Sequence, residues 1–220
     1  MEVAMIVSHK HKFIFIKTKK TAGTSLEIAL SGICGPDDII TPITREDELV
    51  REKLGYRGPQ NYRNGNSNYF NHIPAIIVRN ALGETIWREY FKFCFERNPW
   101  DKVVSWYYWE IAQGGQIPFD DFIKSGNFAL VGGPGGFNQY TDDEQKIILD
   151  KVYLYEDMQS ALFDLAARLN IAAIPKLPKA KSTYRKNRKP YADMYSELNK
   201  NILQKAFQRE IDLFNYRFQV

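Results

Sequence analysis

The sequence contains few cysteines and few histidines. Cys34 and Cys94 are its two cysteines, and each lies among apolar neighbours. Two cysteines cannot form a disulfide framework, so we expect both to be reduced core residues of a cytoplasmic protein. The three histidines, His9, His11 and His72, are too scattered to match a zinc-binding pattern, and we therefore expect no metal ion.

The sequence also lacks long hydrophobic runs and a strong excess of one charge. No apolar run approaches the ~20 residues that span a bilayer, and residues 1–12 lack the apolar core of a signal peptide. We therefore expect no membrane span and a cytoplasmic location. A net charge of +4 does not indicate a nucleic-acid partner, and we expect none. A hydrophobic content of 44% over 220 residues indicates a packed globule, which we expect to be a single domain over residues 1–220.

Apolar runs and helix-capping signals predict an α/β fold. Phe13–Ile16 is a continuous apolar run, as in a strand buried on both faces, and a helix is expected over residues 24–30. Tyr90–Phe95 is expected to be a second strand, and the pair Asn98-Pro99 is typical of a helix start. The other expected elements are a strand within Ile147–Tyr155 and helices at Ile73–Leu82, Pro99–Gln113, Phe119–Lys124, Met158–Leu169 and Ser196–Phe214. This alternation predicts a mainly parallel central sheet flanked by helices on both faces.

A short loop rich in Lys, Thr, Gly and Ser joins the first expected strand to the first expected helix. Such a loop directs backbone N–H groups and a helix N-terminus toward one point, which suits a phosphate. It is not a Walker A loop, because its lysine, Lys20, precedes the glycine instead of ending the motif. The alternative is an ordinary strand–loop–helix turn with solvated lysines. We expect a cation from Lys20 and hydrogen-bond donors from Thr21, Ala22, Gly23, Thr24 and Ser25.

The second expected strand is followed by an arginine and, two helical turns later, by a serine. Arg97 lies at the carboxyl end of this strand, where a guanidinium can bind a doubly charged phosphate. Asp101 and Ser105 lie one turn apart and share a helix face. The alternative is that Arg97 pairs with Asp101 and that Ser105 only fills a helix position.

The two motifs, in this order, resemble those of sulfotransferases that use 3′-phosphoadenosine 5′-phosphosulfate (PAPS) as donor. Residues 20–25, K-T-A-G-T-S, are similar to the loop that binds the 5′-phosphosulfate. Residues 97–105, R-N-P-W-D-K-V-V-S, are similar to the 3′-phosphate site, where that family uses the arginine and the serine. Three later segments resemble landmarks of the carbohydrate branch, the heparan and chondroitin sulfotransferases: Tyr155–Met158, Leu177–Lys179 and Asp212–Tyr216.

The resemblance implies a P-loop-like sulfotransferase fold and transfer of a sulfuryl group from PAPS to a hydroxyl, on a carbohydrate in the branch that it resembles. In-line displacement would give a sulfate ester and 3′,5′-ADP (PAP). Lys20 would stabilise the bridging oxygen, and residues 21–25 would hold the 5′-phosphate. Arg97 and Ser105 would bind the 3′-phosphate. Cationic side chains and loop amides would neutralise the charge without a metal ion.

A basic segment from Pro175 to Pro190 resembles the late loop of that family, which covers the 3′-phosphate and the adenine; the alternative is a solvated flexible loop. The resemblance implies donor contacts from Ser182 and Arg185 in this segment. The chain departs from the branch pattern H-x-P-K-T in the first loop, where Lys17 and Lys19 take the places of the histidine and the proline.

Transfer to a hydroxyl needs a base, because the proton leaves as the O–S bond forms. Neutral histidine suits this task, since its pKa lies near the working pH. His72 follows a long polar loop and starts an expected helix capped by Asn71, and relatives in the resembled branch carry their base in a comparable region. We therefore expect His72 to be the base, with a surface or capping histidine as the alternative. His11 is a second candidate, and Glu27 is a third, with a salt-bridged helix position as its alternative.

Two other functions fit parts of the sequence. A P-loop small-molecule kinase shares the strand–loop–helix start, but the sequence has no G-K-[ST] and no acidic strand end to hold Mg²⁺. A non-catalytic polyanion-binding module could use the late basic segment, but 26 Asp and Glu balance most of the 30 Lys and Arg. Dependence on Mg²⁺ would indicate the kinase, and salt-sensitive binding without turnover would indicate the module.

Overall fold

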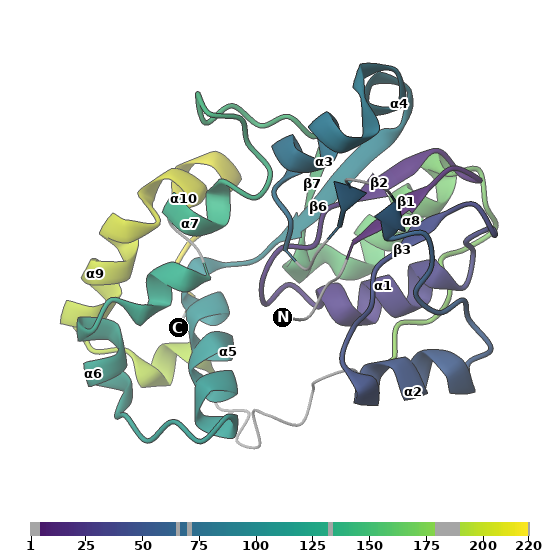
Figure 1. The fold of residues 1–220 in the computed structure, drawn as a ribbon. Coiled ribbons are helices and arrows are strands. Elements are labelled where there is room, and N and C mark those ends of the chain that lie inside the picture. The colour runs from purple at the N-terminus through teal and green to yellow at the C-terminus, as the bar shows by residue number, and fades with distance from the viewer. Residues whose placement is uncertain (1–4, 65–66, 70–71, 132–133, 179–189, 220) are drawn as a thin grey trace. The chain divides into compact units, whose positions relative to one another are not determined.

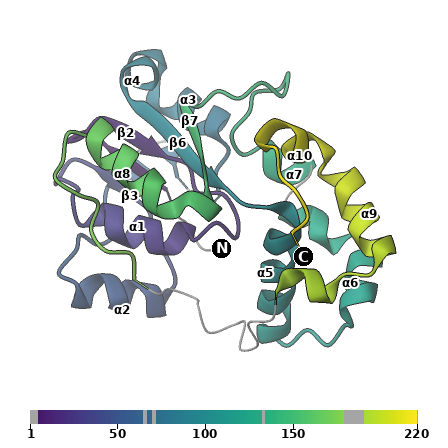
Figure 2. The same cartoon turned by 180° about the vertical axis from the view of Figure 1, so that it is seen from behind.

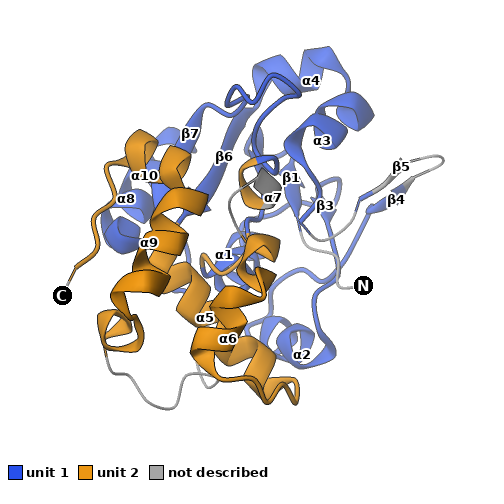
Figure 3. Ribbon diagram, turned by 90° about the vertical axis from the view of Figure 1, so that its left-hand side faces the viewer, with its two compact units in different colours: residues 1–18, 22–96, 138–180 blue, residues 19–21, 97–137, 181–220 orange. Residues whose placement is uncertain are grey.

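The structure is a computed structural model that describes residues 5–64, 67–69, 72–131, 134–178 and 190–219. It divides the chain into two compact units, which Figure 3 colours separately. Unit 1 contains residues 1–18, 22–96 and 138–180, and unit 2 contains residues 19–21, 97–137 and 181–220. The first motif is therefore shared between them, with Lys19–Thr21 in unit 2 and the residues from Ala22 onward in unit 1.

Unit 1 is built on a five-stranded sheet with the strand order β3-β1-β2-β6-β7 (Figure 1). The strands are β1 (Ile6–Ser8), β2 (Phe13–Phe15), β3 (Ile39–Ile40), β6 (Phe91–Glu96) and β7 (Lys151–Leu154). The predicted α/β fold is confirmed, and the expected parallel pairing is present on both sides of β6. β1 adds antiparallel pairs with β2 and β3. The sheet is therefore mixed, because the short connection between β1 and β2 cannot make a parallel crossover.

Two helices cover one face of this sheet. Phe13 and Phe15 of β2 point to the same face as Phe93 of β6, whose ring contacts both of them. Helices α1 (Gly23–Ser31) and α8 (Met158–Arg168) pack on these rings in one hydrophobic core. Figure 2 shows both helices along this face.

A third helix lies on the other face. Lys92 alternates with the phenylalanines of β6 and so points away from them. Its Nζ donates hydrogen bonds to the carbonyl oxygens of Trp87 and Tyr90, both at 2.9 Å. Trp87 belongs to α4 (Glu84–Glu89), so helices flank the sheet on both faces, as expected.

Unit 1 also contains a helix that hydrophobic periodicity does not predict, because its residues are mostly charged. This helix, α2 (Arg45–Lys53), is capped by Thr44, whose Oγ1 accepts from the backbone N of Asp47 at 3.2 Å. The sequence T-x-x-D is a known helix-start signature, and here it outweighs the polar composition. The smaller elements of unit 1 are β4 (Arg63–Asn64), β5 (Ser67–Asn68) and η2 (Tyr155–Asp157).

The helix expected from Ile73 begins two residues later. It is α3 (Ala75–Leu82), and Pro74 is its N-cap. The expected cap, Asn71, lies outside the described residues. His72 therefore precedes the helix instead of starting it, and its backbone is left-handed with a φ of 54°.

The described part of unit 2 is helical. Asn98 caps α5 as expected, because its Oδ1 accepts from the backbone N of Trp100 at 3.1 Å. The single helix expected over Ser196–Phe214 is divided in two at Phe207, which is buried next to Phe128. The elements are α5 (Pro99–Ala112), α6 (Phe119–Lys124), η1 (Asn127–Leu130), α7 (Pro134–Phe137), η3 (Tyr191–Met194), α9 (Glu197–Ala206) and α10 (Gln208–Phe214).

The remaining expectations concern the cysteines, membrane spans and metal ions. Cys34 and Cys94 are buried and are not joined in a disulfide. None of the helices in the described ranges is long and apolar enough to cross a membrane. Among the same residues, no three or more His, Cys, Asp or Glu gather where they could hold a metal ion.

Candidate functional site

The loop of the first motif has an unusual backbone. It runs from the end of β2 to α1, and Lys20 and Ala22 have positive φ angles of 61° and 62°. Such conformations cost a non-glycine residue ~1–3 kcal/mol, and they gather at binding and catalytic sites. Ala22 is the N-cap of α1, and no described side chain caps this helix or places an acid in its first turn. The positive end of the helix dipole therefore favours an anion there.

The small residues of the loop are packed tightly. Thr21, Thr24 and Ser25 expose only 1%, 8% and 6% of their surfaces. A Cβ at Gly23 would lie 2.5 Å from Cγ of Lys17, so glycine lets the Lys17 side chain cross the start of α1. Binding of a phosphate by residues 21–25 stays a prediction.

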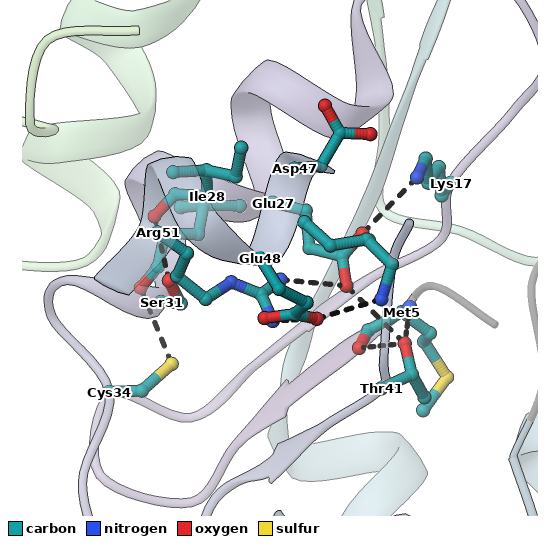
Figure 4. A network of polar contacts seen from close by, with 12 residues as sticks. Met5, Lys17, Glu27, Ile28, Ser31, Cys34, Thr41, Asp47, Glu48 and Arg51 are labelled. Atoms are coloured by element: carbon teal, nitrogen blue, oxygen red, sulfur yellow. Dashed lines mark hydrogen bonds and ion pairs between the residues drawn. The ribbon is translucent and has the colours of Figure 1, made fainter. Parts of the chain in front are cut away.

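A buried carboxylate in α1 connects the strand end before the loop to α2 (Figure 4). Glu27 has no exposed surface, and its Oε2 lies 3.2 Å from Nζ of Lys17. Its Oε1 lies 3.3 Å from Nη2 of Arg51 and accepts a hydrogen bond from Oγ1 of Thr41 at 3.4 Å. Nη1 of Arg51 also binds both carboxylate oxygens of Glu48 at 3.0 Å. Two carboxylates therefore face two cations inside unit 1.

Glu27 has a shifted pKa. Burial raises the pKa of Glu27 from 4.5 to about 7, while the positive charges of Lys17 and Arg51 oppose the shift. The carboxyl can therefore exchange its proton near neutral pH. Its contacts are those of a salt-bridged helix position, which is the alternative that the sequence analysis gives for this residue.

His72 is held by both its ring and its backbone. Its Nδ1 lies 2.8 Å from the carbonyl oxygen of Lys17. A carbonyl oxygen can only accept, so Nδ1 carries the proton and the lone pair of the neutral ring lies on Nε2. Nε2 of Gln139 donates to the carbonyl oxygen of His72 at 3.1 Å. The geometry therefore gives a half-buried histidine whose Nε2 has the chemistry of a proton acceptor.

The second base candidate, His11, has its contacts at the turn after β1. Nε2 of His11 lies 3.0 Å from the carbonyl oxygen of Ile33, just past the end of α1. The backbone N of His11 donates to Oγ of Ser8 at 3.1 Å. The ring is therefore tied to the chain at the end of α1 opposite to its start at Gly23.

Arg97 links the two motifs within unit 2. Its Nε and Nη2 donate to Oδ2 of Asp101 at 3.0 and 2.5 Å, and its Nη1 donates to the carbonyl oxygen of Lys20 at 3.0 Å. The pair with Asp101 is the alternative that the sequence predicts, whereas the contact with Lys20 is not foreseen. The guanidinium is thus oriented from two segments that lie far apart in the sequence.

Positive charge gathers around this part of unit 2. The rings of Trp106 and Trp109 stack with centroids 4.6 Å apart. Nζ of Lys20 lies 5.9 Å from the centroid of Trp109, and Nζ of Lys19 lies 5.9 Å from that of Trp106. Burial, and then the charge of Lys102, lowers the pKa of Lys19. An added anion would relieve this repulsion between the two ammonium groups.

The remaining expected donor contacts are only partly within the described residues. Ser105 lies in α5, one turn after Asp101, and is half-buried. It therefore shares unit 2 with Lys20 and Arg97. Ser182 and Arg185 lie outside the described residues. The roles of all these residues stay predictions.

Some residues of these clusters are not predicted from the sequence. The T-x-x-D signature before α2 could have indicated that helix, but no local signal shows that Arg51 turns inward. The replacement of the branch histidine by Lys17 marks an altered position without naming a partner. Gln139 carries no signal at all, because its contacts are with His72 and Ala75, far away in the sequence.

Comparison with protein-family models finds no match to the chain. A solved sulfotransferase from Alicyclobacillus acidocaldarius aligns over 94% of this chain and 96% of its own, at 18% identity and a TM-score of 0.47. A mouse sulfotransferase, solved in complex with PAP, aligns over 94% of this chain and 87% of its own, at 13% identity and a TM-score of 0.48.

A relative in sequence comes from an archaeon. An uncharacterized protein of Archaeoglobus fulgidus is 33% identical over 103 residues, which are 45% of this chain and 83% of the relative. The match therefore takes in most of the archaeal protein. The chain belongs to the same protein family as this Archaeoglobus protein.

Proposed function

We propose that the chain is a sulfotransferase that moves a sulfuryl group from PAPS to a hydroxyl group on a carbohydrate. The observation that carries this proposal is the hydrogen bond from Nη1 of Arg97 to the carbonyl oxygen of Lys20 at 3.0 Å. It connects the two sequence motifs that resemble the donor-binding motifs of sulfotransferases. Both residues are cationic, as binding of a donor with several phosphate charges requires.

The electrostatics of unit 2 support an anionic donor. Lys19, Lys20 and Arg97 bring three cationic side chains to one region, and the pKa of Lys19 is lowered first by burial and then by the charge of Lys102. Lys20 would neutralise the charge that develops on the oxygen between sulfur and the 5′-phosphorus. Arg97 would bind the 3′-phosphate, and Ser105 would add a hydroxyl donor.

The contact at Nδ1 of His72 supports general-base catalysis, because in the neutral ring it leaves Nε2 as the basic nitrogen. Its proton on Nδ1 is held by the carbonyl oxygen of Lys17, so Nε2 can take the proton of the acceptor hydroxyl. The hydroxyl oxygen then forms a bond to sulfur while the bond from sulfur to the 5′-phosphate oxygen breaks. The products are a sulfate ester and 3′,5′-ADP, and the proton resides on His72.

A thermal-unfolding titration tests the donor class. The thermal unfolding midpoint of the protein is measured in the presence of 3′,5′-ADP, of 5′-AMP and of ATP–Mg²⁺, in parallel titrations. A ligand at ~100 times its Kd stabilises the folded state by ~2.7 kcal/mol, which is readily measured. We expect stabilisation by 3′,5′-ADP and not by 5′-AMP, because only the former has the 3′-phosphate. Stabilisation by ATP–Mg²⁺ alone would replace the proposal with a kinase, and no response would indicate a binding module.

A turnover assay tests the reaction and the acceptor. Labelled PAPS is incubated with unsulfated polysaccharides and with simple alcohols, in the presence of EDTA so that divalent metals are absent. We expect label to be transferred to a polysaccharide by the wild-type protein and to be lost with Lys20→Ala. Lys124→Ala is the matched control, because Lys124 is an exposed lysine of unit 2 that lies 4.0 Å from Asp121. Transfer only to simple alcohols would contradict the carbohydrate acceptor but not sulfuryl transfer.

A further inference from the structure

We propose that Lys17 is the positioning residue of the base: its carbonyl oxygen holds Nδ1 of His72, and its ammonium group, held by Glu27, keeps that carbonyl in place. This inference rests on the proposed function, in which His72 takes the proton of the acceptor. It goes beyond that function because it gives a role to a buried ion cluster that lies outside the donor motifs.

The backbone on either side of Lys17 is fixed to β6. The backbone N of Ile16 donates to the carbonyl oxygen of Phe93 at 2.9 Å. Oγ1 of Thr18 donates to the carbonyl oxygen of Phe95. The peptide that carries the Lys17 carbonyl is therefore held from both neighbours, and its oxygen reaches Nδ1 of His72 at 2.8 Å.

The side chain of Lys17 is fixed as firmly as its backbone. Its Nζ donates to Oε2 of Glu27 at 3.2 Å, and the side chain is only 6% exposed. Glu27 is in turn held by Arg51 from α2, with 3.3 Å between Oε1 and Nη2. Gly23 leaves just enough space for the lysine stem, as the 2.5 Å approach of an added Cβ to Cγ indicates. Lys17 is therefore held both at its carbonyl oxygen, by His72, and at its ammonium group, by Glu27.

The histidine side of the contact is equally constrained. His72 has a left-handed backbone with a φ of 54°, which is uncommon for a residue other than glycine. Gln139 holds this segment at two points. Its Nε2 donates to the carbonyl oxygen of His72 at 3.1 Å, and its backbone carbonyl accepts from the backbone N of Ala75 at 2.8 Å.

These contacts select one tautomer of the imidazole. A hydrogen-bonded carbonyl at Nδ1 keeps the proton there and leaves Nε2 as the basic nitrogen. In triads of hydrolases a carboxylate has this orienting function. Here a backbone carbonyl has it, and the carboxylate of Glu27 acts one step further away, through the lysine side chain.

Substitution of Lys17 by methionine tests the inference. Lys17→Met keeps the length and the apolar stem but removes the charge, and Glu27 can become neutral because its pKa is about 7. The nitrogens of His72 are observed by long-range ¹H–¹⁵N correlation NMR, which distinguishes the two tautomers of a neutral ring. The sequence has three histidines, so His72→Asn assigns the signals. The kcat for sulfuryl transfer and the binding of 3′,5′-ADP are measured on the same samples.

The expected result has three parts. In Lys17→Met the His72 ring changes from protonation at Nδ1 alone to a mixture of tautomers, and kcat falls roughly 10–100-fold because the base is misplaced. The affinity for 3′,5′-ADP stays within about twofold, because only the chemical step is affected. Lys12→Met is the matched control, since Lys12 is an exposed lysine of unit 1 paired with Glu89 at 3.5 Å, and it should change neither the nitrogens nor kcat.

Other outcomes separate this inference from the proposed function. An unchanged tautomer in Lys17→Met would overturn the inference, whatever happens to kcat. A changed tautomer with an unchanged kcat would overturn it as well, because the lysine would then hold a histidine that is not the base. If the wild-type protein transfers no sulfuryl group, the proposed function fails and the inference fails with it, while the nitrogen spectra still report whether Lys17 orients the ring. Lys17→Gln gives the same comparison if the methionine variant does not fold.

Discussion

Nη1 of Arg97 and the carbonyl oxygen of Lys20 form a hydrogen bond of 3.0 Å between residues that lie far apart in the sequence. The same guanidinium is paired with Asp101, through Nε and Nη2. Arg97 therefore holds the loop that carries Lys20, and it is also a cation of the proposed donor site. Its removal affects loop geometry and ligand charge together.

Replacement of Arg97 by alanine should weaken the binding of 3′,5′-ADP by about 2–4 kcal/mol, because a phosphate loses a largely buried charged partner. This loss corresponds to a rise in Kd of roughly 30- to 1,000-fold, measurable by titration calorimetry. Arg79→Ala is the control, since Arg79 forms an exposed pair with Glu84 in unit 1. An unchanged Kd in Arg97→Ala would show that its pairing with Asp101 is purely structural.

Replacement of His72 by asparagine should lower kcat by about 10²–10⁴-fold without loss of the fold. Asparagine tolerates the left-handed backbone at this position, and its side-chain amide can donate to the Lys17 carbonyl oxygen as Nδ1 does. It cannot take up a proton. Steady-state kinetics at saturating donor measures the loss, and the thermal midpoint measures the fold. Retained turnover in a folded His72→Asn protein would exclude His72 as the base.

The pH dependence of stability should report on Glu27. Its folded-state pKa of about 7 lies above the ordinary value of 4.5, so the folded protein binds the proton more tightly than the unfolded chain. The contribution is complete below pH 4.5 and is lost as the pH rises through about 7, and its size is on the order of 3 kcal/mol. The groups that act on this carboxyl are Lys17, Arg51 and Glu48.

Urea unfolding at pH 5 and pH 8 compares wild type with Glu27→Gln. Glutamine imitates the protonated carboxyl, so this part of the stability loss between the two pH values should disappear in the variant. At pH 8 Glu27→Gln should be at least as stable as the wild type. Destabilisation by ~3–5 kcal/mol at pH 8 would instead mean that the ion pairs with Lys17 and Arg51 dominate over the cost of burial.

Replacement of Gly23 by alanine should destabilise unit 1 by about 1–3 kcal/mol, because the new Cβ meets the stem of Lys17. The added Cβ would lie 2.5 Å from Cγ of Lys17, which is close to the lysine backbone, where the side chain has little freedom to move. Gly58→Ala is the matched control, since nothing lies within 4 Å of a Cβ at that position. Chemical denaturation of both variants measures the difference, and equal stability would show that the lysine stem can rearrange.

The strands and helices that position the motifs are predictable from the sequence. The apolar run at Phe13–Ile16 and the aromatic run at Tyr90–Phe95 both give strands, because continuous apolar residues suit a sheet covered on two faces. The Asn98-Pro99 pair gives a helix start, because asparagine satisfies a free N–H and proline has none. α2 is missed because its stability comes from capping and from one inward-facing arginine rather than from periodicity.

The contacts within the candidate site are much less predictable. The pairing of Arg97 with Asp101 is predictable because it is local: Asp101 lies in the first turn of the helix that follows Arg97. The contacts of Glu27 with Arg51 and of His72 with the Lys17 carbonyl join segments brought together only by the tertiary fold. Periodicity and motif spacing describe local order and carry no information on such pairs.

The division of the chain into interleaved units has a consequence for synthesis of the protein. Residues 19–21 leave the ribosome early, but their unit also needs residues 97–137 and 181–220. Unit 1 likewise waits for residues 138–180, which bring β7 to the edge of its sheet. Domains commonly fold one after another as the nascent chain emerges. The units of this chain are interleaved instead, and the loop that carries Lys20 meets Arg97 and Trp109 only after residues 22–96 of unit 1 have been synthesised.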